Sequence, residues 1–301
     1  MSLSQIQYFN PRKLIVLNYA KNLVQHNIKN AGERKCTKNA LFQALYLHIC
    51  KKSSNFARDF ENNQLPITMY LMLIAALLPA VLLGIYIWKK DPLPEPGKWI
   101  FRAVLAGVII CIPVALVEQQ LMHVLFPSGE PTTLFGTTIE AFLVAALPEE
   151  TAKLLALWLV LRKNPYFDER FDGIVYAVCV GLGFAAIENV FYVFQSGEGW
   201  ITVAAMRALL AVPGHYAFAI MMGYYFSVFH FIKHTPGYAV KTLLVPVMAH
   251  GVYDAIAMSA KVDPVAAGLS TLVLFYFCFK LQKAAQQKVY ALRDDYKAGL
   301  A

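Results

Sequence analysis

The chain has 301 residues, of which 58% are hydrophobic and only 15% are charged, and it carries a net charge of +8. Soluble globular domains contain about 25% charged residues, so this composition excludes an ordinary soluble protein and predicts an integral membrane protein. The five cysteines are odd in number and show no CxxC spacing, so no disulfide framework is predicted.

Residues 1–66 are a basic segment, with ten Lys or Arg residues against three acidic ones. Apolar groups recur between the basic residues at near-helical spacing, which predicts short amphipathic helices. A solvated cap and a membrane-surface or partner-binding segment both stay open. Attraction to anionic lipid head groups explains the charge, and no recognition motif favours nucleic acid as a partner. Residues 1–15 lack the features of a secretory signal, so we expect this segment to remain in the mature protein.

Seven apolar runs follow, each long enough to cross a hydrocarbon core of about 30 Å. They cover residues 67–88, 99–125, 134–161, 173–195, 200–232, 240–260 and 264–281. The prediction is an all-α, polytopic transmembrane helical bundle of seven or eight spans, with a membrane core at 67–281 and a charged tail at 282–301. Pro213-Gly214 interrupts the fifth run, which predicts a kink or a short re-entrant piece before His215.

The basic residues of the short loops lie almost entirely in one of the two alternating sets of loops, with only Lys261 in the other set. The positive-inside rule makes the basic side cytoplasmic, and this side includes the C-terminus. Seven spans would place the basic N-terminal segment outside, against its own charge, so the side of the N-terminus stays open.

The centre of the third run reads Pro148-Glu149-Glu150-Thr151-Ala152-Lys153. An ionisable side chain at this depth costs about 2.5 to 3.5 kcal/mol on insertion scales, so such residues tend to face the bundle interior and to be functional. Helical spacing lets Lys153 neutralise either glutamate but hardly both, which leaves one carboxylate for general acid/base chemistry. The alternatives are a structural charge cluster, or a helix broken at Pro148 with the glutamates in its first turn.

A stripe of small residues in the fourth run allows another helix to approach closely; it consists of Gly173, Ala177, Gly181 and Ala185. The stripe continues to Glu188 and Asn189, which we therefore expect in a packed helix interface. At 1.5 Å per residue they lie within about 6 Å of mid-depth, in one layer with the glutamate pair.

His215 and His250 lie near the centres of the fifth and sixth runs. Each alone is more often a hydrogen-bonded core histidine, but their common depth with the glutamates favours one site. Asp254, four residues after His250, can hold the imidazole in one tautomer. Arg207 is expected to be a structural partner of one of the acids.

Several known catalytic patterns are absent from the sequence. It contains no HExxH and no GxSxG, which excludes a standard zincin and a serine nucleophile elbow. Gly181-Leu182-Gly183 is followed by Phe184 rather than by an aspartate, so Asp254 has no evident partner for an aspartyl dyad.

Four motifs stand in order along the chain: Glu149-Glu150-xx-Lys153, then Phe171-Asp172-Gly173 with Gly183-Phe184-Ala185-xx-Glu188-Asn189, then Pro213-Gly214-His215, and finally His250-Gly251-Val252-Tyr253-Asp254. Over roughly residues 134–260 the chain thereby resembles the PrsW family of bacterial membrane proteases, a relative of the CAAX prenyl endopeptidase and abortive-infection protease superfamily. The resemblance implies a multi-pass protein of the bacterial inner membrane. It also implies a catalytic site at Glu149, Glu150, His215 and His250, with Glu188 as a further candidate, and an anti-sigma factor as substrate. The basic N-terminal segment departs from the compact family core.

We therefore expect an intramembrane endopeptidase that cuts single-span or membrane-anchored proteins, with a glutamate as general base and with supporting roles for Lys153, Glu188, Asn189 and Asp254. A proton-coupled transporter and a catalytically inactive scaffold are the alternatives. No internal repeat of the kind common in transporters is evident.

A catalytic zinc and a metal-free mechanism both stay open. His215, His250 and either Glu149 or Glu188 would supply three zinc ligands, with water as the fourth. Without a metal, the glutamate takes the proton from water and the histidines donate hydrogen bonds to the oxyanion. A zinc site leaves the second glutamate and Lys153 unexplained, which favours the metal-free version.

Overall fold

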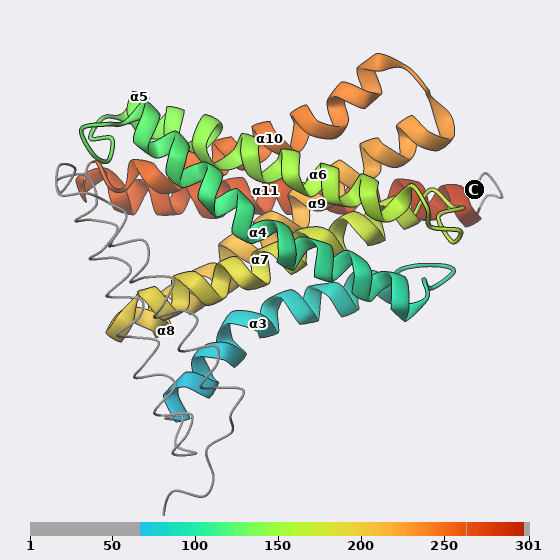
Figure 1. Cartoon of the computed structure of the whole chain (residues 1–301), viewed down its shortest axis with the longest axis horizontal. Coiled ribbons are helices and arrows are strands. Elements are labelled where there is room, and N and C mark those ends of the chain that lie inside the picture. The colour runs from blue at the N-terminus through green and yellow to red at the C-terminus, as the bar shows by residue number, and fades with distance from the viewer. Residues whose placement is uncertain (1–66, 263, 298–301) are drawn as a thin grey trace, which may run out of the picture. The chain divides into compact units, whose positions relative to one another are not determined.

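The computed structural model describes residues 67–262 and 264–297, and these residues are helical with no strand. Predictions for the basic segment 1–66 therefore lie outside the described residues. In chain order the elements are α3 (Ile67–Trp88), α4 (Gly97–Leu125), α5 (Leu134–Ile139), η2 (Glu140–Ala146), α6 (Leu147–Leu161), α7 (Asp172–Gln195), η3 (Gly197–Gly199), α8 (Trp200–Met206), η4 (Arg207–Ala211), α9 (Val212–Ser227), η5 (Val228–Ile232), α10 (Pro236–Ser259) and α11 (Pro264–Lys297) (Figure 1).

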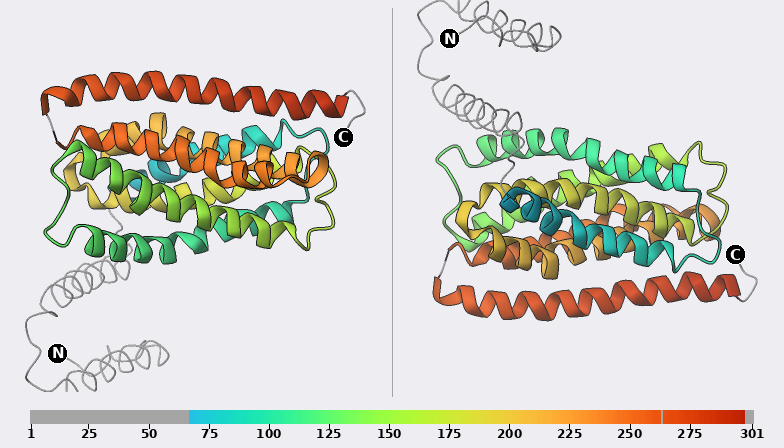
Figure 2. Two further views of the ribbon diagram at one scale, coloured as in Figure 1. Left: turned by 90° about the horizontal axis from the view of Figure 1, so that it is seen from above. Right: turned by 90° about the horizontal axis from the view of Figure 1, so that it is seen from below.

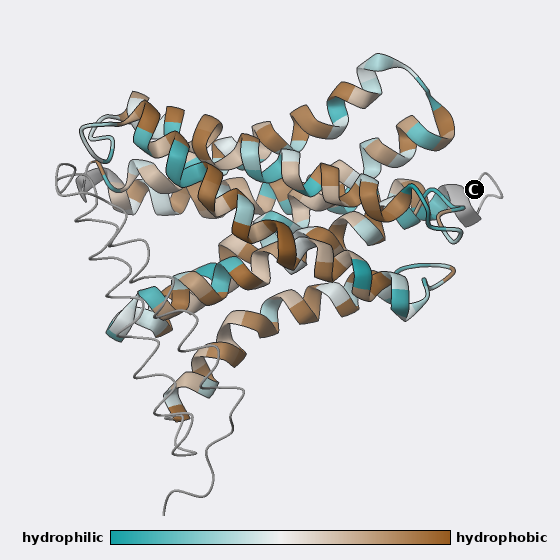
Figure 3. Ribbon diagram, viewed as in Figure 1, coloured by the Kyte–Doolittle hydropathy of each residue, from teal (hydrophilic) through white to brown (hydrophobic). Residues whose placement is uncertain are grey.

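Five of these helical segments are long and apolar enough to cross a membrane: 67–88, 97–125, 172–195, 197–232 and 236–259. The predicted all-helical membrane bundle is confirmed, whereas the count of seven or eight spans is not. The expected span at 134–161 consists of α5, η2 and α6, of which the longest has 15 residues. The long helix α11 is not among the five, although it is continuous from 264 to 297. Apolar residues predominate along the helices, and polar ones gather in the connections between them (Figure 3).

Helix α7 is the centre of the bundle, because α3, α4, α6, α8 and α9 all pack against it. Its predicted stripe of small residues faces α9. A Cβ added at Gly173 would overlap Ser227, and one at Gly181 would lie 2.8 Å from the Cβ of Ala219. The predicted close helix interface is therefore confirmed, and it fixes the position of Glu188 about two turns beyond Gly181 along α7.

Two of the four helices that carry site residues, α6 and α9, begin where a π-helix changes into an α-helix. η2 leads into α6, with Pro148 at its second position, and η4 leads into α9, with Pro213 at its second position. Of the two alternatives expected at Pro213, a kink or a re-entrant piece, the re-entrant piece is wrong, because the chain stays helical from residue 200 to residue 232. The wide i→i+5 turns end where proline has no N–H to donate, so the register changes without a break.

Residues 282–297 of the predicted charged tail continue the long helix α11. α11 runs along one flank of the bundle in both views of Figure 2. Beyond residue 281 it still buries apolar side chains against the main core, namely Ala285, Val289 and Leu292.

Candidate active site

The first part of the site lies in the first two turns of α6. Lys153 Nζ lies 2.8 Å from Glu149 Oε2 and 2.8 Å from Glu150 Oε1. The i+3 and i+4 side chains converge on one ammonium, so Lys153 contacts both glutamates, but its single charge can neutralise only one of them. All three residues are buried, at 5%, 0% and 3% exposure for Glu149, Glu150 and Lys153. One positive charge between two carboxylates leaves a net negative charge in this triad.

Helices α9 and α7 contribute the second part. His215 Nδ1 lies 3.2 Å from Lys153 Nζ, and His215 Nε2 lies 2.8 Å from Glu188 Oε2. Arg207 donates from Nη2 to Glu188 Oε2 at 2.8 Å and from Nε to the side-chain oxygen of Asn189. Arg207 therefore pairs with an acid, Glu188, as predicted. His215 connects the α6 triad to this second ion pair.

His250 on α10 completes the arrangement. Its Nδ1 lies 2.9 Å from Glu150 Oε1, and its Nε2 lies 3.2 Å from Asp254 Oδ2. The ring stacks on Phe218 with centroids 4.7 Å apart, and it lies edge-on to His215 at 5.3 Å. Asp254 thus occupies the position predicted for a residue that orients the imidazole. The predicted site residues from four helices are brought together in one cluster.

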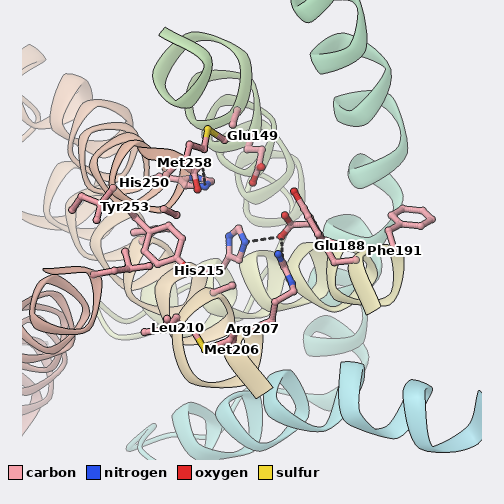
Figure 4. A pocket seen from close by; sticks show the side chains of 18 of the residues that line it. Glu149, Glu188, Phe191, Met206, Arg207, Leu210, His215, His250, Tyr253 and Met258 are labelled. Atoms are coloured by element: carbon pink, nitrogen blue, oxygen red, sulfur yellow. Dashed lines mark hydrogen bonds and ion pairs between the residues drawn. The ribbon is translucent and has the colours of Figure 1, made fainter. Parts of the chain in front are cut away.

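A cavity of about 640 Å³ opens beside the cluster, and Figure 4 shows the side chains that line it. Its polar lining includes Glu149, Glu188, His215 and His250. Glu150 and Lys153 are not among the lining residues. The two adjacent glutamates therefore differ: one faces the cavity and the other lies in the protein behind it. Apolar side chains such as Leu210, Met206 and Phe191 make up much of the rest of the lining.

Sequence reasoning missed Glu118 of α4, which also lines the cavity. Its Oε1 is buried without a hydrogen-bond partner among the described residues. The sequence did contain a signal for Glu118, because a carboxylate inside an apolar run is itself unusual. The aromatic residue Phe184, whose ring lies 4.3 Å from the Lys153 ammonium, was not predicted as a neighbour of the charges.

The donor set of the cluster fits a zinc-type metal ion. Glu149, Glu150, His215 and His250 each offer a ligand atom, and these atoms all lie within 4.8 Å of one another. Imidazole nitrogens and carboxylate oxygens are ordinary ligands of catalytic zinc. Glu150 Oε2 is buried and has no partner among the described residues, so one ligand atom is available without breaking a contact. Glu188, the other predicted ligand, is not in this set where the structure is described.

The three cysteines of the described part, Cys111, Cys179 and Cys278, are free and buried.

Comparison with known proteins gives a consistent result. Residues 95–281 match the family described as PrsW family intramembrane metalloprotease. The chain is similar to Protease PrsW of Geobacillus kaustophilus, with 34% identity over 225 residues that make up 74% of this chain and 95% of the relative. It is also similar to Protease PrsW of Clostridioides difficile, with 33% identity over 62% of this chain and 79% of the relative, and to that of Bacillus subtilis, with 30% identity over 62% and 82%. No solved structure matches the chain significantly.

Proposed function

The chain belongs to the PrsW family of intramembrane metalloproteases and is a membrane peptidase; from this premise we propose that it cuts membrane-associated proteins with a water molecule activated by Glu149. The observation that carries the assignment is the difference between the two glutamates. Glu149 lines the cavity, where water and a peptide bond have room. Glu150 is fully buried and is engaged by Lys153 and His250.

In the proposed reaction Glu149 takes a proton from water, and the water oxygen attacks the carbonyl carbon of the peptide bond. The C–N bond then breaks, and Glu149 returns the proton to the leaving amine. Lys153 holds the carboxylate in place from the side away from the cavity. The second water proton stays on the attacking oxygen, so the products are a new carboxylic acid, which then loses its proton to solvent, and a new amine.

The histidines have different tasks in this proposal. The weaker of the two His250 contacts is the one at 3.2 Å, from Nε2 to Asp254. We assign this N–H as the donor to the oxyanion that develops on the peptide carbonyl. His215 has both nitrogens engaged, by Lys153 and Glu188. It therefore keeps the two charged groups in fixed positions beside the reacting water.

A metal ion would leave the base in place, but it would displace one present contact of each histidine, because both nitrogens of His215 and of His250 are engaged. His215, His250 and Glu150 would hold it, because Glu150 has the unpartnered oxygen. When bound, zinc supplies a Lewis acid that polarises the water and the peptide carbonyl. Glu149 then remains free to accept the proton, which accounts for the second glutamate.

The proposal also covers the superfamily to which the chain is related, its substrate and its orientation in the membrane. The motif order supports a relationship to the CAAX and abortive-infection protease superfamily, in which a double-glutamate helix and two later helices form the site. By the same resemblance we propose a single-span or membrane-anchored substrate, with an anti-sigma factor as the first to test. The basic loops favour a cytoplasmic C-terminus in the bacterial inner membrane.

The test is cleavage of a panel of single-span bacterial membrane proteins in proteoliposomes. The wild-type protein is compared with Glu149→Gln, with Glu130→Gln as the control, because Glu130 carries an exposed carboxylate outside the cluster. We expect cleavage by the wild type and by the control only. Full cleavage by Glu149→Gln would overturn the assigned mechanism.

A further inference from the structure

A second group of buried carboxylates lies outside the cavity. Asp91 and Glu95 belong to the connection between α3 and α4, and Asp172 is the first residue of α7. Each offers one carboxylate oxygen, and the three oxygens lie within 4.8 Å of one another. The three residues are 6%, 5% and 0% exposed. Carboxylates so close together and so deeply buried repel each other unless a positive charge or protons intervene.

A fourth carboxylate, Glu169, comes from the connection between α6 and α7. It is buried, and its charge acts on Asp91. The charged groups that act on Asp91 are Glu95 and Glu169, and both carry the same sign of charge as Asp91.

Part of the hydrogen-bonding capacity of the group is used. Asp172 Oδ2 accepts the N–H of Asp168 at 3.1 Å and the N–H of Glu169 at 2.8 Å. The Tyr176 hydroxyl donates to Glu95 Oε2. These bonds fix the direction in which Asp172 and Glu95 present their remaining oxygens.

The carboxylate oxygens that accept no hydrogen bond indicate a ligand. Asp91 Oδ2, Asp172 Oδ1 and Glu169 Oε2 are buried without a hydrogen-bond partner among the described residues. An unsatisfied buried acceptor costs on the order of 1 to 3 kcal/mol, and more when it is charged, so native proteins rarely leave several in one place. Burial first, and then the charges of Glu95 and Glu169, raise the pKa of Asp91 to about 7, which shows how costly its ionised form is without a counter-charge.

We propose that Asp91, Glu95 and Asp172 bind a hard divalent cation, Mg²⁺ or Ca²⁺, between the α3–α4 connection and the start of α7, and that the charge of Glu169 strengthens this binding. An all-oxygen carboxylate set with no imidazole or thiolate suits these ions rather than zinc. The ion ties the α3–α4 connection to the start of α7, the helix that carries Glu188. This site is separate from the peptidase cluster and does not depend on the function proposed for it.

The experiment uses the full chain in detergent, freed of metal with a chelator and then dialysed. MgCl₂ and CaCl₂ are titrated separately, and calorimetry measures binding while intrinsic fluorescence measures the unfolding midpoint. The variants are Asp91→Asn and Glu169→Gln, each of which removes one charge with little change of shape. Asp294→Asn is the control, because this exposed carboxylate lies on α11 outside the group. Glu149→Gln serves as the reference for the peptidase cluster.

We expect one saturable site per chain for at least one of the two ions. At a concentration about 100 times the dissociation constant, the midpoint should rise by roughly 5 to 10 °C. Asp91→Asn and Glu169→Gln should weaken binding at least about tenfold, and Asp294→Asn and Glu149→Gln should not. The proposal is overturned if neither ion binds or shifts the midpoint, since protons would then satisfy the carboxylates. It is equally overturned if the ion binds the two group variants as tightly as it binds the wild type.

Discussion

Replacing Glu149 by Gln tests the central assignment, because it keeps the side-chain shape and removes the base. The amide oxygen can still accept a hydrogen bond from Lys153, and Lys153 keeps its other carboxylate partner, Glu150, at 2.8 Å. Loss of a general base lowers the rate about 100 to 10,000-fold. At 1.36 kcal/mol per factor of ten, this corresponds to about 2.7 to 5.4 kcal/mol of transition-state stabilisation. We expect the loss in kcat and only a small change in thermal stability.

Glu150→Gln is the matched comparison, because the residue is adjacent but serves different contacts. Glu150 Oε1 accepts from Lys153 and lies 2.9 Å from His250 Nδ1, and the residue is completely buried. Breaking a buried charged pair costs about 3 to 5 kcal/mol when one partner remains. We therefore expect a larger fall in the unfolding midpoint than for Glu149→Gln.

Cleavage is measured under single-turnover conditions in proteoliposomes, and unfolding is measured in detergent on the same preparations. The reasoning is refuted if Glu149→Gln cleaves at the wild-type rate while Glu150→Gln is inactive and fully stable. Equal, small losses of activity in both variants would instead indicate that the pair has a structural role only.

Four further predictions concern other parts of the chain. Gly181→Leu should destabilise the protein by about 1 to 3 kcal/mol, because the larger side chain overpacks the α7–α9 interface. Gly268→Leu is the control and should leave the unfolding midpoint in detergent unchanged, because this glycine is exposed and a Cβ there would meet no atom within 4 Å. Equal unfolding midpoints for the two variants would refute the packing argument. Lys153→Met should bind zinc at least about tenfold more tightly in equilibrium dialysis, because the ammonium lies 2.8 Å from Glu150 Oε1 and 3.2 Å from His215 Nδ1 and repels a cation held there. Unchanged affinity would show that the ammonium does not act on the metal ligands. Asp254→Asn should lower kcat about 10 to 100-fold with little change in KM, since it loosens His250, and an unchanged kcat would show that the contact does not orient the ring. A fluorescent protein fused after residue 301 should fold and fluoresce, because the C-terminus is expected in the cytoplasm. If this fusion is dark and a periplasmic reporter enzyme fused at the same place is active, the C-terminus lies outside and the proposed orientation is refuted.

The class of the protein and the members of the cluster followed from one physical fact. Ionisable side chains are expensive in hydrocarbon, so their presence at one depth in separate apolar runs indicated a shared interior site. This argument found Glu149, His215 and His250 without any knowledge of the helix arrangement. The small-residue stripe on α7 predicted that Glu188 faces a neighbouring helix and not lipid. Each of these inferences depends only on helical period and on depth.

Other features depend on how helices are rotated and on which loops meet, and these are not encoded in local periodicity. The different surroundings of Glu149 and Glu150 result from the rotation of α6 within the bundle. The continuous path through Pro213 depends on π turns, which have no simple sequence signal. The carboxylates Asp91 and Asp172 are 81 positions apart and meet only because two connections fold over the start of α7.

The π segment before α6 has a consequence for how related sequences are aligned. A π turn is closed by an i→i+5 bond instead of the i→i+4 bond of an α-helix, so η2 holds more residues per turn than an α-helix does. Deleting one residue within 140–146 would let the segment relax to α geometry, and each residue of an α-helix accounts for about 100° of rotation. Either the upstream helix or the glutamate pair would then turn away from its present neighbours. Gaps in this short stretch would therefore mark proteins in which the cavity is built differently, even where every charged residue of the cluster is retained.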